Sequence, residues 1–107
     1  MQAGTVVSYA EDQGHPLAEI ALPNREHVRL TLDRDGLAIT RLARPGRLAE
    51  VLFQADANVV SRICAGLYSL ETTSRPTPLR ILVAAVVQLG SAENVREAFR
   101  EVTVALR

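Results

Sequence analysis

The side chains that could do chemistry in this chain begin with its single cysteine, Cys64. A thiol becomes a nucleophile only when a neighbouring base or cation stabilises its thiolate. Cys64 falls on the apolar side of a helical pattern with Val60, Ile63 and Leu67, where a free cysteine behaves as a small hydrophobic residue. We therefore expect a structural cysteine. A lone cysteine also excludes an internal disulfide and fits a reducing, cytoplasmic compartment.

The two histidines and the paired acids are the next candidates. His15 and His27 are twelve residues apart with turns between them, which is no recognised spacing for metal ligands. The acid pairs at 11–12 and at Asp33 and Asp35 lie in predicted turns, whereas acid–base catalysis needs a desolvated carboxyl group. The six glycines are isolated, so no phosphate-binding loop is visible. We expect no catalytic residue, no metal and no cofactor, and these residues favour a non-enzymatic protein over an enzyme.

Arginines gather in one segment of a chain that is neutral overall. Residues 25–47 contain six Arg against three acids, a net charge of +3. A basic sheet face of this kind could bind phosphates of a nucleic acid, or an acidic protein. However, no aromatic side chain interleaves the arginines, and they do not lie along one helix that could enter a groove. The candidate contacts for this alternative function are Arg25, Arg29, Arg41, Arg44 and Arg47.

The first half of the chain alternates apolar and polar residues with the period of half-buried strands. The predicted strands are 5–9, 17–22, 27–33 and 37–42. Asp-Gly at 35–36 indicates a hairpin between the last two, because Gly accepts the positive φ of a tight turn. A two-residue loop would pair Leu32 with Ile39, and a four-residue loop would pair it with Leu37. Both registers keep these three side chains on one face.

The next segment, 48–54, fits either a strand or a helix. Ala49, Val51 and Phe53 alternate as in a strand, and the Val-Leu-Phe triplet favours that reading. Asp56 then looks like the N-cap of a helix that should end near Leu70. The apolar stripe of that helix is Val59, Val60, Ile63, Cys64 and Leu67.

The stretch Leu79–Leu89 dominates the second half, because only Arg80 and Gln88 in it are polar. A helix that is apolar all round must be covered on nearly every side. The stretch is too short to cross a bilayer, which takes about 20 apolar residues, so we expect protein to cover it and no membrane partner. The predicted cover is the sheet, the last helix and a second copy of the chain.

A buried strand would read much like this stretch. Residues 80–90 resemble the opening strand of carbon–nitrogen hydrolases of the nitrilase type, over about a tenth of the chain. The catalytic Glu, Lys and Cys of that family would lie beyond Arg107, so the resemblance implies a strand and no activity. The length of the apolar stretch and the Ala-Ala pair at its centre favour a helix instead. This helix would begin at Thr77-Pro78 and be capped by Gly90.

Ser91 is the predicted N-cap of the last helix. Its expected buried stripe is Val95, Ala98, Phe99, Val102 and Leu106. Together these elements predict one α+β domain spanning 1–107, with an antiparallel sheet of four to five strands in the N-terminal half. Two to three C-terminal helices should pack on one face of that sheet.

The function that this reading favours is a small non-enzymatic protein-interaction or assembly module, homodimeric or bound to another protein. The expected interface residues are Leu79, Leu82, Val83, Val86, Phe99 and Val102. A small-molecule-binding domain is a further alternative, which a buried polar cluster at His27, Tyr9 or Tyr68 would support. The absence of Lys beside twelve Arg is typical of a GC-rich genome, and we expect a bacterial source.

Overall fold

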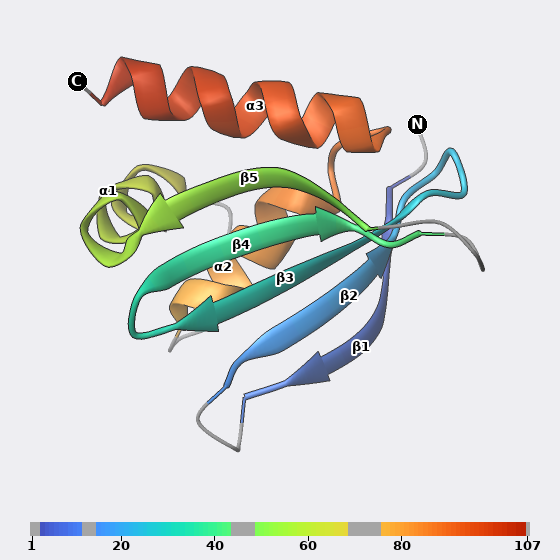
Figure 1. Cartoon of the computed structure of the whole chain (residues 1–107), viewed down its shortest axis with the longest axis horizontal. Helices are drawn as coiled ribbons and strands as arrows, with labels where there is room; N and C mark the ends of the chain where they lie inside the picture. The colour runs from blue at the N-terminus through green and yellow to red at the C-terminus, as the bar shows by residue number, and fades with distance from the viewer. Residues whose placement is uncertain (1–2, 12–14, 44–48, 69–75, 107) are drawn as a thin grey trace.

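The computed structural model describes residues 3–11, 15–43, 49–68 and 76–106. Five strands form one antiparallel sheet in chain order, and three helices follow them (Figure 1). The predicted α+β architecture is therefore confirmed. The strands are β1 (Thr5–Ala10), β2 (Leu17–Ala21), β3 (His27–Asp33), β4 (Gly36–Arg41) and β5 (Glu50–Asp56), and the helices are α1 (Ala57–Leu67), α2 (Pro78–Val86) and α3 (Ala92–Ala105).

The helices contact the sheet from one side. α2 contacts β2 and β3, α1 contacts β4 and β5, and α3 contacts β5, alongside which it runs in Figure 1. Alternate strand residues are buried on this side, as the period of a half-buried strand requires. These buried strand residues are Ala18, Ile20, Val28, Leu30, Leu37, Ile39 and Leu52.

The β3–β4 hairpin adopts the register that pairs Leu32 with Leu37, and Asp33 with Gly36. The Asp33 carboxylate fixes this register, because its Oδ1 accepts hydrogen bonds from the backbone N–H groups of Asp35 at 2.8 Å and of Gly36 at 3.1 Å. Gly36 has a φ of +145°, and a Cβ there would lie 1.9 Å from the carbonyl oxygen of Ala55 on β5. Only glycine fits this position.

The strand predicted over 48–54 forms as β5, but a bulge changes which side chains it buries. Ile39 pairs with Phe53 and Thr40 with Val51, so Leu52 is an extra residue without a partner across the ladder. Leu52 is buried against the helices, whereas Val51 remains 53% exposed. The alternation read from the sequence therefore fails at Val51.

The predicted start of α1 is confirmed. The side chain of Asp56 accepts a hydrogen bond from the Val59 N–H at 2.9 Å. The helix buries Val60, Ile63 and Cys64, and it ends at Leu67. The predicted end near Leu70 lies outside the described residues.

The apolar stretch is a helix, α2, so the strand alternative is wrong. Its N-cap is Thr77, whose hydroxyl accepts from the Arg80 N–H, and Pro78 occupies the first turn. The helix ends at Val86, earlier than predicted, with Val87 as its C-cap in place of Gly90. The remaining residues up to Gly90 turn the chain towards α3.

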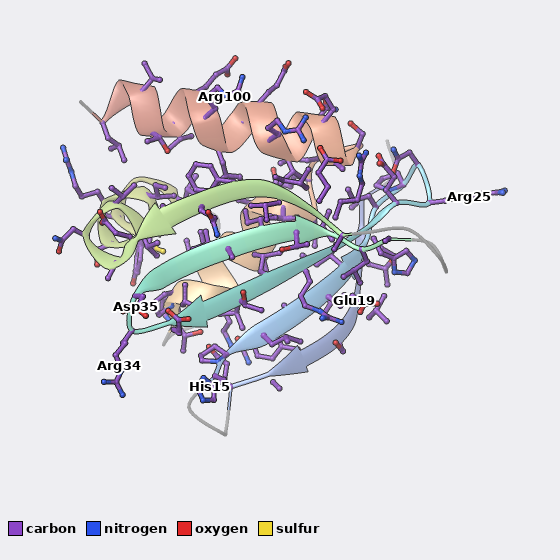
Figure 2. The ribbon with its side chains drawn as sticks, viewed as in Figure 1. His15, Glu19, Arg25, Arg34, Asp35 and Arg100 are labelled. Atoms are coloured by element: carbon purple, nitrogen blue, oxygen red, sulfur yellow. The ribbon has the colours of Figure 1, made fainter. Side chains whose placement is uncertain are left out.

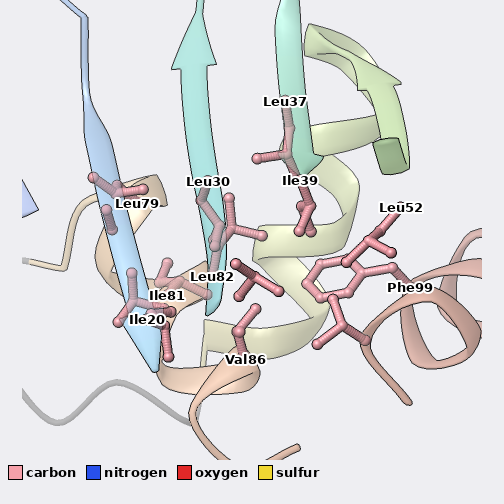
Figure 3. Close-up of a cluster of buried hydrophobic side chains, with 14 of the residues drawn as sticks. Ile20, Leu30, Leu37, Ile39, Leu52, Leu79, Ile81, Leu82, Val86 and Phe99 are labelled. Carbon is pink, nitrogen blue, oxygen red and sulfur yellow. The ribbon is translucent and has the colours of Figure 1, made fainter. Parts of the chain in front are cut away.

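A single copy of the chain encloses α2, contrary to our expectation. Leu79, Leu82 and Val86 are fully buried, and Ile81 and Val83 are at most 8% exposed. Figure 3 shows the α2 side chains among residues of β2, β3 and β4 and the ring of Phe99. The expectation failed because α2 is short and lies on the sheet beside α1, and the sheet and α1 together cover its apolar surface.

The last helix follows the prediction at its start and along its stripe. The Ser91 hydroxyl accepts from the Asn94 N–H at 3.1 Å. Val95 and Phe99 are buried, and the Phe99 ring packs against the Phe53 ring with centroids 5.3 Å apart. This aromatic pair joins α3 to β5.

Two glycines give a matched test of the hairpin geometry. We expect Gly36→Ala to lower the free energy of unfolding by about 2–4 kcal/mol, because its Cβ would meet β5 backbone at a positive φ. Gly66→Ala should instead raise it by about 0.5–1 kcal/mol, because no atom lies within 4 Å of a Cβ there and alanine favours a helix. Urea denaturation measures both, and equal effects would contradict this account.

Candidate functional site

The structure does not bring the predicted basic residues together. Arg25 sits in the β2–β3 turn with a φ of 75° and extends away from the molecule (Figure 2). Arg29, on the helix-free face of the sheet, lies 3.8 Å from the Glu19 carboxylate. Arg41 is ion-paired at the end of β4, and Arg44 and Arg47 lie outside the described residues. No basic face forms among the arginines that the structure describes.

The ion pairs of Arg41 belong to a network of alternating charge beside the start of α3. Arg41 binds Glu26 at 2.9 Å and also Glu50. Glu50 in turn binds Arg96 of α3, which binds Glu93 at 2.7 Å. Three carboxylates and two guanidinium groups therefore satisfy one another. This network ties β4, β5 and the β2–β3 turn to α3, and it leaves these arginines little charge to offer a phosphate.

Glu26 also caps α3. Its Oε1 accepts the Ala92 N–H at 3.1 Å, at the positive end of the helix. The amide of Asn24, which donates to the same carboxylate, lowers the pKa of Glu26 most, and the Ala92 N–H and Arg41 lower it further against an opposing effect of burial. The pKa of Glu26 is therefore below its ordinary value. The ionised form is the one that holds α3.

We expect Glu26→Gln to lower the free energy of unfolding by about 1–2 kcal/mol at neutral pH, because it removes a charge-assisted cap and one ion pair. A carboxyl group with a depressed pKa stabilises the fold above its unfolded-state pKa and loses that contribution as the pH falls through its folded-state pKa. The difference between wild type and variant should therefore shrink below about pH 4. Urea titrations at several pH values measure it, and a difference independent of pH would contradict the assignment.

The remaining polar candidates show no catalytic arrangement. Burial raises the pKa of the Cys64 thiol, whose Sγ lies 3.8 Å from the carbonyl oxygen of Pro78, so it stays protonated. His27 is partly exposed, 3.3 Å from Glu19, and His15 is exposed. No group of three potential metal ligands occurs among the described residues, and no described helix is long and apolar enough to cross a membrane.

The predicted interface residues lie inside the fold. Val102 is partly buried, and the other five are at most 8% exposed within one chain. Side chains in this position pack the monomer, so they have almost no surface with which to contact a partner. They are Leu79, Leu82, Val83, Val86 and Phe99.

β1 lies at one end of the strand order, and we call its outer side the β1 edge. β1 is the first strand of the sheet, and among the described strands it pairs with β2 alone. Residues 5–10 carry no charge, and Val6 and Val7 are 42% and 53% exposed. A bulge at Val7 leaves this residue without a partner on β2. Charged side chains and prolines are the usual protection of an edge strand, and β1 has neither.

Both ends of β1 are fixed to α2. The Gly4 N–H donates to the carbonyl oxygen of Val87, at the end of α2, over 2.7 Å. At the other end, the Tyr9 hydroxyl lies 3.5 Å from the hydroxyl of Thr77, the N-cap of α2. Gly4 also approaches the sheet closely, because a Cβ there would lie 3.1 Å from the carbonyl oxygen of Ala21. The β1 edge is thus held in place although one of its sides is unpaired.

A groove of about 220 Å³ runs between β1 and α2, and we call it the β1–α2 groove. It is lined by Val6, Tyr9, Arg80, Val83 and Ala84. The Arg80 guanidinium lies 5.5 Å from the centre of the Tyr9 ring, a cation–π contact, and it makes no ion pair with any described residue. The groove is therefore apolar, with one cation at its rim.

Tyr9 is the centre of a polar cluster, as the small-molecule alternative requires, but the cluster is only partly buried. Thr77 donates to the Glu11 carboxylate at 2.6 Å while lying beside the Tyr9 hydroxyl. Burial raises the pKa of Tyr9, and its hydrogen bond with Glu11 adds to this effect. The phenol is thus held neutral. These groups bind one another and fix the end of β1.

No family model, curated protein or solved structure matches this chain. The sequence predicted that β1 is a strand but not that it lies at an edge of the sheet, because the residues of one strand do not determine the order of the strands. The uncharged run at 5–10 was the available signal.

Proposed function

We propose that this chain is a small non-enzymatic protein-interaction module that binds an extended polypeptide segment as an added strand along the β1 edge. The observation that supports it is an uncharged, exposed edge strand whose two ends are fixed to α2. The proposal keeps the interaction role expected from the sequence and moves its surface from the buried face of α2 to β1.

Backbone pairing would supply most of the affinity. An edge strand presents a row of unpaired N–H and C=O groups, which an incoming strand can satisfy. Six residues in β1 give a seam about 20 Å long. Because Gly4 and Tyr9 already hold this strand against α2, little conformational entropy remains to be lost when the segment binds.

The β1–α2 groove would supply specificity. Successive side chains of an added strand point to opposite faces, so alternate ones would face the α2 side. An apolar side chain there would contact Val6 and Ala84. We therefore expect bound segments to be rich in apolar residues.

We expect Val7→Lys to reduce the binding of extended peptides at least tenfold, because a lysine on the edge opposes strand pairing. The probes are peptides selected from a random phage-displayed library on the wild-type protein, with affinity measured by fluorescence anisotropy. The matched controls are Val51→Lys on β5 and Val104→Lys on α3, since both valines are also more than half exposed.

Each control should leave peptide affinity within twofold of wild type. All three changes lie on the surface, so the free energy of unfolding should change by about 0.5 kcal/mol or less. Peptides that bind equally well to the Val7→Lys protein, or that lose affinity only with Val51→Lys, would contradict the proposal.

A further inference from the structure

We infer that the segment bound at the β1 edge is β1 of a second copy of this chain, paired antiparallel about a two-fold axis. The inference rests on the proposed function and names its partner. Such pairing would join the two sheets into one continuous sheet across the dimer. A two-fold contact uses the same surface on both copies, so the β1 edge must be complementary to itself.

Charge is the first reason to choose a second copy. An edge with several charges of one sign would repel its own copy, because like charges directly opposite one another destabilise a strand pair. Residues 5–10 contain no charged side chain, so two copies of β1 can approach without this cost. The exposed side chains of Val6 and Val7 would then contact apolar groups in place of water.

The cation beside β1 determines where the axis should lie. The Arg80 guanidinium lies 5.5 Å from the centre of the Tyr9 ring, so a change of register that moves the two Tyr9 residues apart also moves the two Arg80 side chains apart. With Val7 on the axis, Tyr9 of one copy faces Thr5 of the other. The two Tyr9 residues are then four residues apart along the strands, about 13 Å. With Ser8 on the axis, that separation is about 7 Å. Screening acts over about 8 Å, so repulsion favours Val7.

The other edge of the sheet explains why pairing should stop at two copies. If β1 could pair with β5 of another copy, the contact would not close and filaments would grow. β5 has an acid at each end, Glu50 and Asp56, and it contains the bulge at Leu52. α3 also runs alongside it (Figure 1). The terminal acids and the covering helix protect β5 as an edge strand, and residues 5–10 of β1 contain no charge, so β1–β1 pairing remains.

Cysteine crosslinking tests the predicted axis. Facing residues of antiparallel strands have Cα atoms about 4.5–5.5 Å apart, a separation that a disulfide can span. We expect Val7→Cys to form a covalent dimer under mild oxidation at least ten times faster than Val51→Cys or Val104→Cys. Unmodified protein controls for Cys64, which is buried and should not crosslink.

Sedimentation equilibrium of the full chain gives the second readout. Wild type should show a monomer–dimer equilibrium. Val7→Lys should raise the dissociation constant of the dimer at least tenfold, and Val104→Lys should leave it unchanged. This measurement needs no cysteine variant to fold. Wild type that is monomeric at high micromolar concentration, or Val7→Cys that crosslinks no faster than Val51→Cys, would overturn the self-pairing.

The two proposals fail in different ways. If the protein is monomeric but selected peptides still bind and are weakened by Val7→Lys, the second copy is the wrong partner and strand addition at β1 stands. If Val7→Lys affects neither peptide binding nor the dimer, the β1 edge is not the interaction surface and both proposals fall.

Discussion

Burial of the short helix α2 against the sheet and against α1 is the constraint on which the rest of this structure depends. α2 has the most apolar sequence in the chain, and its side chains fill the space between β2, β3 and α1. The same helix holds β1, because its C-terminal end accepts the Gly4 N–H and its N-cap meets Tyr9. A helix that forms the core therefore also positions the one uncharged edge of the sheet.

Electrostatics in this protein serves the fold more than recognition. The alternating network from Glu26 to Glu93 fixes the start of α3 with ion pairs and a helix cap. Partly exposed pairs of this kind contribute modestly one by one, but a connected set also fixes geometry. Because Arg41 and Arg96 are held in this network, their positive charge is balanced by carboxylates within the fold.

The two edge strands of the sheet differ in the features that protect them from pairing with another chain, and this difference supports an interaction role. β5 has terminal acids, a bulge and α3 beside it, whereas β1 has a bulge but no charge. Arg80 lies at the rim of the groove next to β1 and has no ionic partner among the described residues. The β1 edge thus combines backbone groups that can pair with side chains that can select what pairs.

Local patterns in the sequence determined the elements and their caps. Alternation predicted the strands, and Asp56, Thr77 and Ser91 each cap the helix expected of them, because a cap depends on a few neighbouring residues. Strand register, burial and the packing of the helices were decided only by the tertiary structure. The hairpin register depended on the Asp33 carboxylate, and the burial of Leu52 depended on a bulge against β4. The cover of α2 depended on its place on the sheet beside α1. The described arginines of residues 25–41, close in sequence, lie apart or are paired with acids because strand direction and packing place charges in space. Which strand is left at an edge is likewise a property of the assembled sheet.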